Sequence, residues 1–164
     1  MRQVVIVSLM ILVLSAGTAH AQSSSYAAVS VGFPLLVNVH YGLEDVFAPG
    51  ADLRLNLGGL FLAAGGEAVF YGVAGADVLY RFNHEDAGAT LSPYAGGGIG
   101  VAFAGFGGGG ADAVGFAFNG SGVVGLEHRA GDTGFFAEAR LNVSAAGGGV
   151  LAWPNIGIGA SFRL

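Results

Sequence analysis

The chain has 164 residues, 31 of them Gly, and it is 53% hydrophobic but only 10% charged. A soluble domain usually carries about a quarter charged residues, and a disordered chain is polar and highly charged, so this composition excludes both classes. The absence of Cys excludes a disulfide scaffold, a Cys-based zinc site and a thiol nucleophile. A formal net charge of −5 argues against nucleic acid as a partner. What remains is a chain of single-domain length whose surface suits lipid.

The first residues predict a targeting segment. Arg2 gives a short basic start, Val4 to Leu14 form an apolar run, and Ala19-His20-Ala21 matches the small-x-small pattern of a signal-peptidase site. We therefore expect a secretory signal peptide over residues 1–21 and a mature domain over residues 22–164. The alternative is an uncleaved anchor, although the apolar run is shorter than the ~20 residues of a spanning helix.

Beyond residue 22, polar and apolar residues alternate with the period of β-strands, as in Asp52–Leu57 and Glu138–Ser144. Turn signals rich in Gly, Asp, Asn and Pro separate eight such runs. We expect strands over residues 25–33, 36–43, 50–62, 67–82, 91–105, 113–129, 134–146 and 151–164, with Glu44–Pro49 as one of the connections. Since an open sheet edge would leave backbone groups unpaired in lipid, an even number of strands predicts an all-β, eight-stranded, antiparallel up-and-down transmembrane β-barrel.

The polar residues of each strand keep one parity, which we assign to the barrel interior. This places all five Arg of the mature chain inside with five acidic residues, and a narrow lumen needs such a balance because unpaired buried charge is costly. The predicted interior charge network comprises Asp52, Arg54, Glu67, Asp77, Arg81, Glu127, Arg129, Glu138, Arg140 and Arg163. The remaining acids are assigned to turns: Glu44, Asp45, Glu85, Asp86, Asp112 and Asp132.

The aromatic residues fall into two groups along the strands, which predicts the girdles that anchor a barrel at the two membrane interfaces. One girdle would hold Tyr26, Tyr41, Tyr80, Phe82, Tyr94, Phe135 and Phe162, and the other Phe33, Phe61, Phe70, Phe103, Phe116 and Trp153. The plainer alternative is that aromatic residues simply favour strands.

Four short motifs carry a resemblance. Ser92–Gly100, Gly125–Arg129 and Phe136–Arg140 resemble segments of the small OmpA/OmpX-type outer-membrane β-barrels. The chain end, with Gly159, Phe162 and Leu164, resembles the C-terminal signal read by the barrel assembly machinery, with Leu164 in place of the final aromatic residue. The resemblance implies a bacterial outer-membrane location, contact with outer-membrane lipids, and periplasmic chaperones and the assembly machinery as partners during biogenesis.

Three functions follow from such a barrel. The first is a monomeric protein without enzymatic activity that has a structural, adhesive or envelope-stabilising role. The connections expected outside are short and Gly-rich, which disfavours adhesion and favours the structural role. The second is a narrow passive channel or transporter of small hydrophobic compounds, since Gly occupies inward positions such as Gly96, Gly98 and Gly100. Those glycines equally permit the tight curvature of a small barrel. The third is a lipid-modifying enzyme, which needs a Ser nucleophile together with a His and an acidic residue. His40 is the only inward His, and no Ser with a plausible acidic partner lies near it in the sequence. We expect no catalytic residue, cofactor or metal site.

Overall fold

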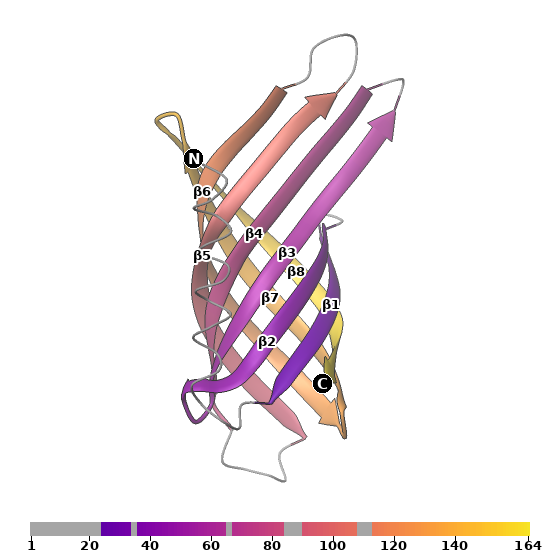
Figure 1. Ribbon diagram of the computed structural model, residues 1–164, viewed down its shortest axis with the longest axis vertical. Coiled ribbons are helices and arrows are strands. Elements are labelled where there is room, and N and C mark those ends of the chain that lie inside the picture. The colour runs from indigo at the N-terminus through magenta and orange to yellow at the C-terminus, as the bar shows by residue number, and fades with distance from the viewer. Residues whose placement is uncertain (1–23, 34–35, 65–66, 84–89, 108–112) are drawn as a thin grey trace.

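Eight antiparallel strands follow one another around a single lumen and close into a barrel (Figure 1). The computed structural model describes residues 24–33, 36–64, 67–83, 90–107 and 113–164. Its strands are β1 (Ser25–Phe33), β2 (Leu36–Ala48), β3 (Ala51–Ala64), β4 (Glu67–Arg81), β5 (Leu91–Gly107), β6 (Ala113–Ala130), β7 (Thr133–Ala146) and β8 (Gly149–Arg163). Each strand pairs with its sequence neighbours, and β1 pairs with β8 to close the sheet. The predicted eight-stranded barrel is confirmed.

The barrel has two unlike rims. Ser24, Leu164, the last residues of β2, β4 and β6 and the first residues of β3, β5 and β7 lie at one rim, the terminal rim, and the opposite strand ends lie at the other, the distal rim. Within the described part of the chain, no helix is long and apolar enough to span a membrane. The predicted signal peptide and the acidic residues Glu85, Asp86 and Asp112 lie outside the described residues.

The predicted end of β2 was wrong. The strand does not stop at residue 43 but continues to Ala48, with a shift of register between Leu43 and Ala48. Asp45 has a φ of 57° in this irregular segment, and its carboxylate accepts a hydrogen bond of 2.6 Å from the backbone N–H of Gly50. A β-bulge of this kind lets a strand absorb extra residues without ending, so the polar stretch after Leu43 does not form the connection that its composition suggests.

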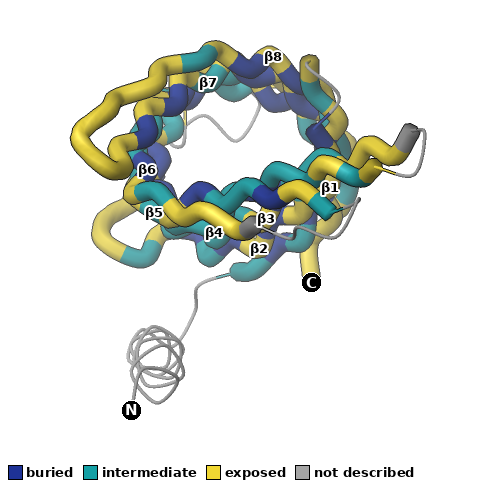
Figure 2. Tube along the Cα trace, turned by 90° about the horizontal axis from the view of Figure 1, so that it is seen from above, coloured by how far each residue is buried: buried dark blue, intermediate teal, exposed yellow. Residues whose placement is uncertain are grey.

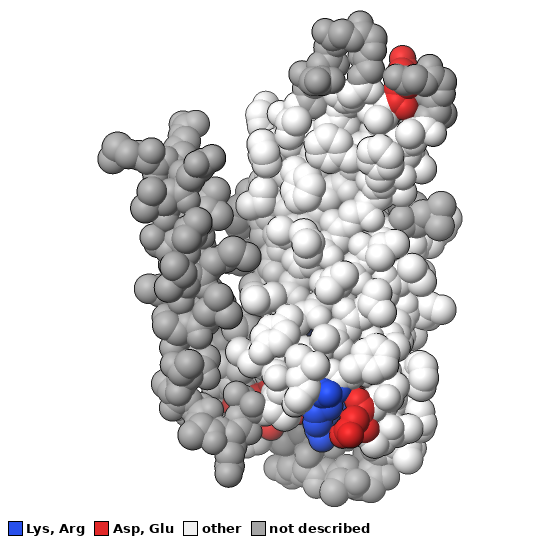
Figure 3. Space-filling model, turned by 45° about the vertical axis from the view of Figure 1, so that its right-hand side comes forward, with Lys and Arg blue, Asp and Glu red and all other residues white. Residues whose placement is uncertain are grey.

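The two faces of the wall differ as the alternation predicts. Polar residues such as Asp52, Asp77 and Asn119 are buried in the lumen, whereas Ile99, Phe116 and other apolar residues are exposed on the outside. Seen down the barrel, exposed and buried stretches surround an oval lumen (Figure 2). The wall in Figure 3 is uncharged, and charged side chains appear there only near the two ends. This is the surface that lipid requires, because a charge on the lipid-facing side of a strand is destabilising.

Three of the aromatic rings inside the lumen each lie against a glycine of the next strand. Tyr26 covers Gly42, Tyr94 covers Gly125 and Phe136 covers Gly159, and each ring occupies the space that a Cβ would need. The assignment of Tyr26 and Tyr94 to a membrane girdle is therefore wrong: both are buried. The missing glycine side chain makes room for the ring, so these pairs fill the lumen near the terminal rim.

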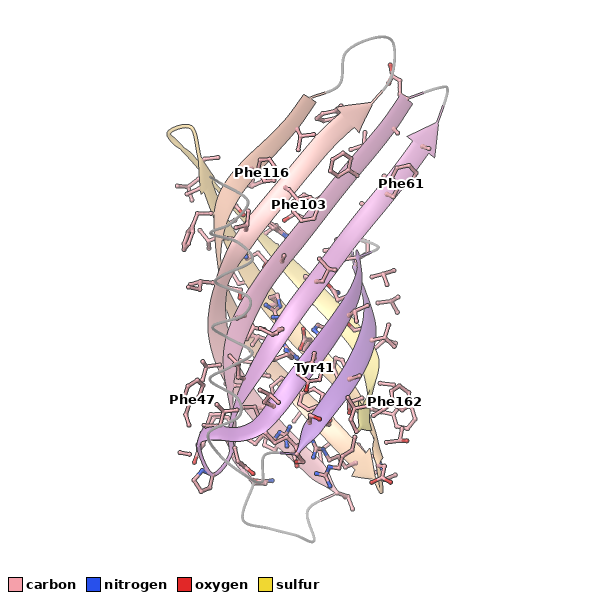
Figure 4. The ribbon with its side chains drawn as sticks, viewed as in Figure 1. Tyr41, Phe47, Phe61, Phe103, Phe116 and Phe162 are labelled. Carbon is pink, nitrogen blue, oxygen red and sulfur yellow. The ribbon has the colours of Figure 1, made fainter. Side chains whose placement is uncertain are left out.

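Other aromatic residues do face outward, in two groups (Figure 4). Near the terminal rim the exposed members are Tyr41, Tyr80, Phe82, Phe135 and Phe162, together with Phe47, which the sequence assignment omitted. Toward the distal rim the exposed members of the predicted set are Phe33, Phe61 and Phe116. Trp153 is not in this outer group, because it pairs with the buried Asn142 and its ring contacts Tyr71, with 5.5 Å between centroids.

The inward glycines of β5 have a steric reason, which leads to a prediction. A Cβ at Gly98 would overlap the backbone carbonyl oxygen of Ala76 and a carboxylate oxygen of Asp77, whereas a Cβ at Gly120 would meet nothing within 4 Å. We predict that Gly98→Ala lowers the free energy of unfolding by about 1–3 kcal/mol, as overpacking does. Gly120→Ala should leave it unchanged or raise it by up to about 1 kcal/mol. Urea unfolding of the refolded barrels measures both, and equal effects would contradict a steric need for glycine.

Candidate functional site

Four charged side chains form a cluster across the middle of the lumen, which we call the central cluster: Arg54, Asp77, Glu138 and Arg140. Arg54 Nη1 lies 2.8 Å from Glu138 Oε2, and its Nη2 lies 3.2 Å from Asp77 Oδ2. Arg140 Nη2 lies 2.6 Å from the same Asp77 oxygen. Because β3 and β7 are not neighbours in the barrel, the Arg54–Glu138 pair spans the lumen. Two positive and two negative charges balance within the cluster.

Uncharged side chains complete the hydrogen bonds of these carboxylates. Asn56 Nδ2 donates to Asp77 Oδ2 at 2.7 Å, and Ser121 Oγ donates to Asp77 Oδ1 at 3.2 Å. The Tyr94 hydroxyl donates to Glu138 Oε2 at 3.1 Å. A buried ion pair is tolerated only when such additional hydrogen bonds offset the loss of hydration. The central cluster is therefore a connected polar layer rather than a set of isolated pairs.

His40 extends this layer toward β1. Its Nδ1 lies 2.7 Å from Asn56 Oδ1, and its Nε2 lies 3.1 Å from Ser30 Oγ. The order Ser30–His40–Asn56 resembles a nucleophile, a base and an orienting group, so the fold supplies the Ser that the sequence did not place near His40. However, Ser30 and His40 are each only 3% exposed, and Asn38 donates a further hydrogen bond to Ser30. The chain of hydrogen bonds therefore acts as part of the packed interior.

A second group of charges, the rim cluster, lies at the terminal rim. Glu44 is its centre: its carboxylate lies 2.7 Å from Arg81 Nη1, 2.6 Å from Arg129 Nη2 and 3.1 Å from Arg163 Nη2, and it accepts a hydrogen bond from Ser24. The other members are Asp52, 2.7 Å from Arg81 Nη2, and Glu127, 3.1 Å from Arg129 Nε. Three Arg thus meet three acids. The guanidinium of Arg81 also lies 5.9 Å from the centre of the Tyr26 ring, within the range of a cation–π contact.

The two clusters contain nine of the ten charged residues expected inside, together with Glu44 in place of Glu67. Glu67 is exposed at the first position of β4, on the distal rim. Glu44 was assigned to a turn, but it is only 4% exposed and belongs to β2. Glu44 has the inward parity of His40, so the alternation of β2 places it in the lumen once the strand is continued beyond residue 43. The expected strand over residues 36–43 stops one residue short of it.

Little space is left between the two clusters. A cavity of about 20 Å³ lies there, lined by Arg54, Arg81, Tyr94 and Phe136 among others. Such a volume holds about one water molecule. Among the described residues, no three His, Cys, Asp or Glu side chains come together in a way that could hold a metal ion.

The residues of the predicted assembly signal lie at the end of β8. Gly159 lies under the Phe136 ring, while Phe162 and Leu164 are exposed. The backbone N–H of Leu164 donates to the Ser25 carbonyl oxygen at 2.9 Å, so the chain end is held against the start of β1.

A matched pair of variants tests whether Glu44, and not Glu67, belongs to the interior charge network. Glu44→Gln removes the carboxylate that three guanidinium groups share, and breaking a buried ion pair from one side costs about 3–5 kcal/mol. We predict a loss of unfolding free energy of that order, measured by urea titration of the refolded barrel. Glu67→Gln, an exposed substitution, should change it by less than about 0.5 kcal/mol. A Glu67 effect equal to that of Glu44 would contradict the assignment.

Comparison with known proteins identifies the architecture. No family model and no curated sequence matches the chain. Among solved structures, Neisserial surface protein A matches with a TM-score of 0.65 at 14% identity, over 87% of this chain and 94% of that one. The N-terminal β-barrel domain of Pseudomonas aeruginosa OprF matches with a TM-score of 0.61 at 19% identity, over 87% and 96%. A major outer membrane protein from Thermus thermophilus matches with a TM-score of 0.61 at 13% identity, over 88% and 100%. The chain therefore has the fold of the small OmpA/OmpX-like outer-membrane β-barrels.

Proposed function

We propose that the mature chain, residues 22–164, is a monomeric, integral outer-membrane protein with a structural role in the envelope and no enzymatic activity. The signal peptide over residues 1–21 directs its export. Periplasmic chaperones and the barrel assembly machinery then deliver it to the membrane, the latter reading the signal formed by Gly159, Phe162 and Leu164. The terminal rim faces the periplasm and the distal rim faces the outside. An uncharged outer wall supports this placement.

The observation that carries the structural role is that side chains fill the lumen from the central cluster to the terminal rim. The central cluster joins side chains from β3, β4 and β7 across the barrel, and hydrogen bonds from β5 and β6 complete it. Aromatic rings and the rim cluster occupy the space between this layer and the terminal rim. Eight-stranded barrels are narrow enough for side chains to fill them. This interior favours a rigid membrane-embedded body over a passive channel.

Three further observations bear on the alternatives. The inward glycines of β5, Gly96, Gly98 and Gly100, lie where the β4 backbone approaches closely, which supports their role in curvature rather than in widening a pore. The Ser30–His40 pair is buried and hydrogen-bonded on both sides, by Asn38 at Ser30 and by Asn56 at His40, which supports a packing role for the pair over that of a nucleophile and its base. The distal connection that the structure describes, Ala146–Gly149, is short and offers little surface for adhesion.

Conductance measurements distinguish a filled barrel from a channel. We predict that the purified, refolded protein gives no single-channel events in planar bilayers, because the charged layer leaves space for about one water. A porin reconstituted into the same bilayers serves as the positive control. Reproducible channel events that scale with the amount of added protein would contradict the proposal.

The envelope role itself is tested in cells. A strain lacking the protein should lose periplasmic protein to the medium and become more sensitive to detergent, and the wild-type chain should restore both properties. The Ser30→Ala variant should restore them equally well, because the proposed role requires no nucleophile. An intact envelope in the deletion strain, or rescue that depends on Ser30 in a variant that still folds, would contradict the proposal.

A further inference from the structure

The distal half of the lumen is unlike the terminal half. A cavity of about 380 Å³ lies there, lined on its inner side by Tyr71, Ala102, Ala104, Gly115, Ala117 and Trp153. This volume is within the ~300–1,000 Å³ of small-molecule sites. None of the residues that line the cavity is charged. The small side chains of β5 and β6 leave this space open, whereas the rings and charges nearer the terminal rim fill theirs.

The cavity also reaches the outer face of the barrel. Its lining includes Phe116 and Val150, which are exposed on the lipid-facing side, at 69% and 73%. The pairing of β6 with β7 ends at Phe118 and Ala145, so the part of β6 from Ala113 to Ala117 extends beyond it. Figure 1 shows the β7–β8 hairpin diverging from this upper part of β6. We call the resulting side opening the β6–β7 seam.

The bottom of the cavity is polar and closed. Ser144, which also lines it, donates a hydrogen bond of 2.9 Å to Asn119, and both side chains are buried. Below them, Arg140 and Asp77 of the central cluster fill the lumen. The edge-on contact between Trp153 and Tyr71 joins β8 to β4 across the barrel and forms a wall of the cavity. The space is therefore a blind apolar pocket that opens sideways.

The height of the seam places it within the membrane. Outward apolar residues follow β6 from Val114 to Leu126, a length that projects to about 30 Å along the barrel axis for a tilted strand. That matches the ~30 Å hydrocarbon thickness of a bilayer. Phe116 lies near the distal end of this band, so the seam faces the lipid chains of the distal leaflet.

We propose that the pocket takes a hydrocarbon chain of a lipid in the distal leaflet, which enters through the β6–β7 seam. The inference rests on the membrane placement proposed above. An apolar lining without charge excludes an ionic ligand, since a buried charge needs a partner. The closed, polar end of the pocket at Ser144 and Asn119 limits how deeply a hydrocarbon chain can insert. The lipid-facing seam admits the chain while its headgroup stays outside the barrel. The bound lipid would be held more firmly than the lipids around the barrel.

Trp153 provides a direct probe, because it is the only Trp in the chain and lines the pocket. The full mature protein is reconstituted into vesicles of phosphatidylcholine whose acyl chains carry bromine, a contact quencher of Trp fluorescence. The double variant Trp153→Phe/Phe116→Trp places the Trp on the lipid-facing side and gives the quenching expected for full contact with lipid. We predict that Trp153 in the wild type is quenched at least half as strongly as this outward Trp. Quenching no stronger than that of an enclosed Trp, in Trp153→Phe/Phe136→Trp, would overturn the proposal. Heat-modifiable gel mobility verifies that each variant has folded.

A second pair of variants tests the pocket itself. Gly115→Leu directs a side chain into the cavity, and its Cβ would meet only the Ala104 carbonyl oxygen at 4.0 Å. It should reduce the quenching of Trp153 by brominated lipid to the level of the enclosed control, whereas Gly122→Leu, outward on the same strand, should not. Unchanged quenching in Gly115→Leu would overturn the proposal. Bromododecane added to vesicles of unbrominated lipid gives a further test. If it quenches Trp153 while brominated lipid does not, the pocket binds a free hydrophobic compound instead of a lipid chain, and the proposal is overturned.

The same measurements separate this proposal from the membrane placement. If the Phe116→Trp reporter is quenched and Trp153 is not, the barrel is in the membrane and the pocket holds no lipid chain. If the Phe116→Trp reporter itself is not quenched, the membrane placement fails, and the lipid proposal fails with it.

Discussion

The interior of this barrel depends on one requirement, that every charge inside the narrow lumen is neutralised by a partner. Moving an ion out of water costs several kcal/mol even after the protein relaxes, so each interior Arg must meet carboxylates at close range. The chain meets this requirement twice. The central cluster pairs two Arg with two acids, and the rim cluster pairs three Arg with three. Arg suits both because it stays ionised and its planar fork reaches two carboxylates at once, as Arg54 does with Asp77 and Glu138.

The glycines complement these clusters. Where β5 approaches β4, as at Gly98, the absent side chain lets two strands curve tightly around the charged layer. Where Tyr94 lies on Gly125, it makes room for a ring whose hydroxyl reaches Glu138. Glycine thus has two separate roles in one half of the barrel. In the distal half, Gly115 and its alanine neighbours have no ring above them, and the lumen there widens into the pocket.

Much of this architecture could be predicted because a barrel imposes a period of two on its strands. Strand number and closure followed from that alternation, as did the inward direction of Arg54, Asp77 and Glu138. The predicted positions that are wrong are those that did not follow this period of two. Tyr94 and Trp153 share the parity of inward neighbours but were assigned to girdles on residue type alone. Glu44 was lost because a β-bulge carries β2 through residues that resemble a turn. The meeting of Ser30 with His40 depends on the β1–β2 register, which composition does not reveal.

The central claim is that Arg54 and Glu138 stabilise the barrel through each other across the lumen, and a double-mutant cycle tests it most directly. The free energies of unfolding of the wild type, Arg54→Met, Glu138→Gln and the double variant are measured by urea titration in the same lipid. Because each single variant leaves a buried group without its partner, we predict that the double variant loses about 1–3 kcal/mol less stability than the sum of the two single losses. Additive losses would mean that the two side chains do not interact, and would contradict the account of the lumen as a layer of paired charges.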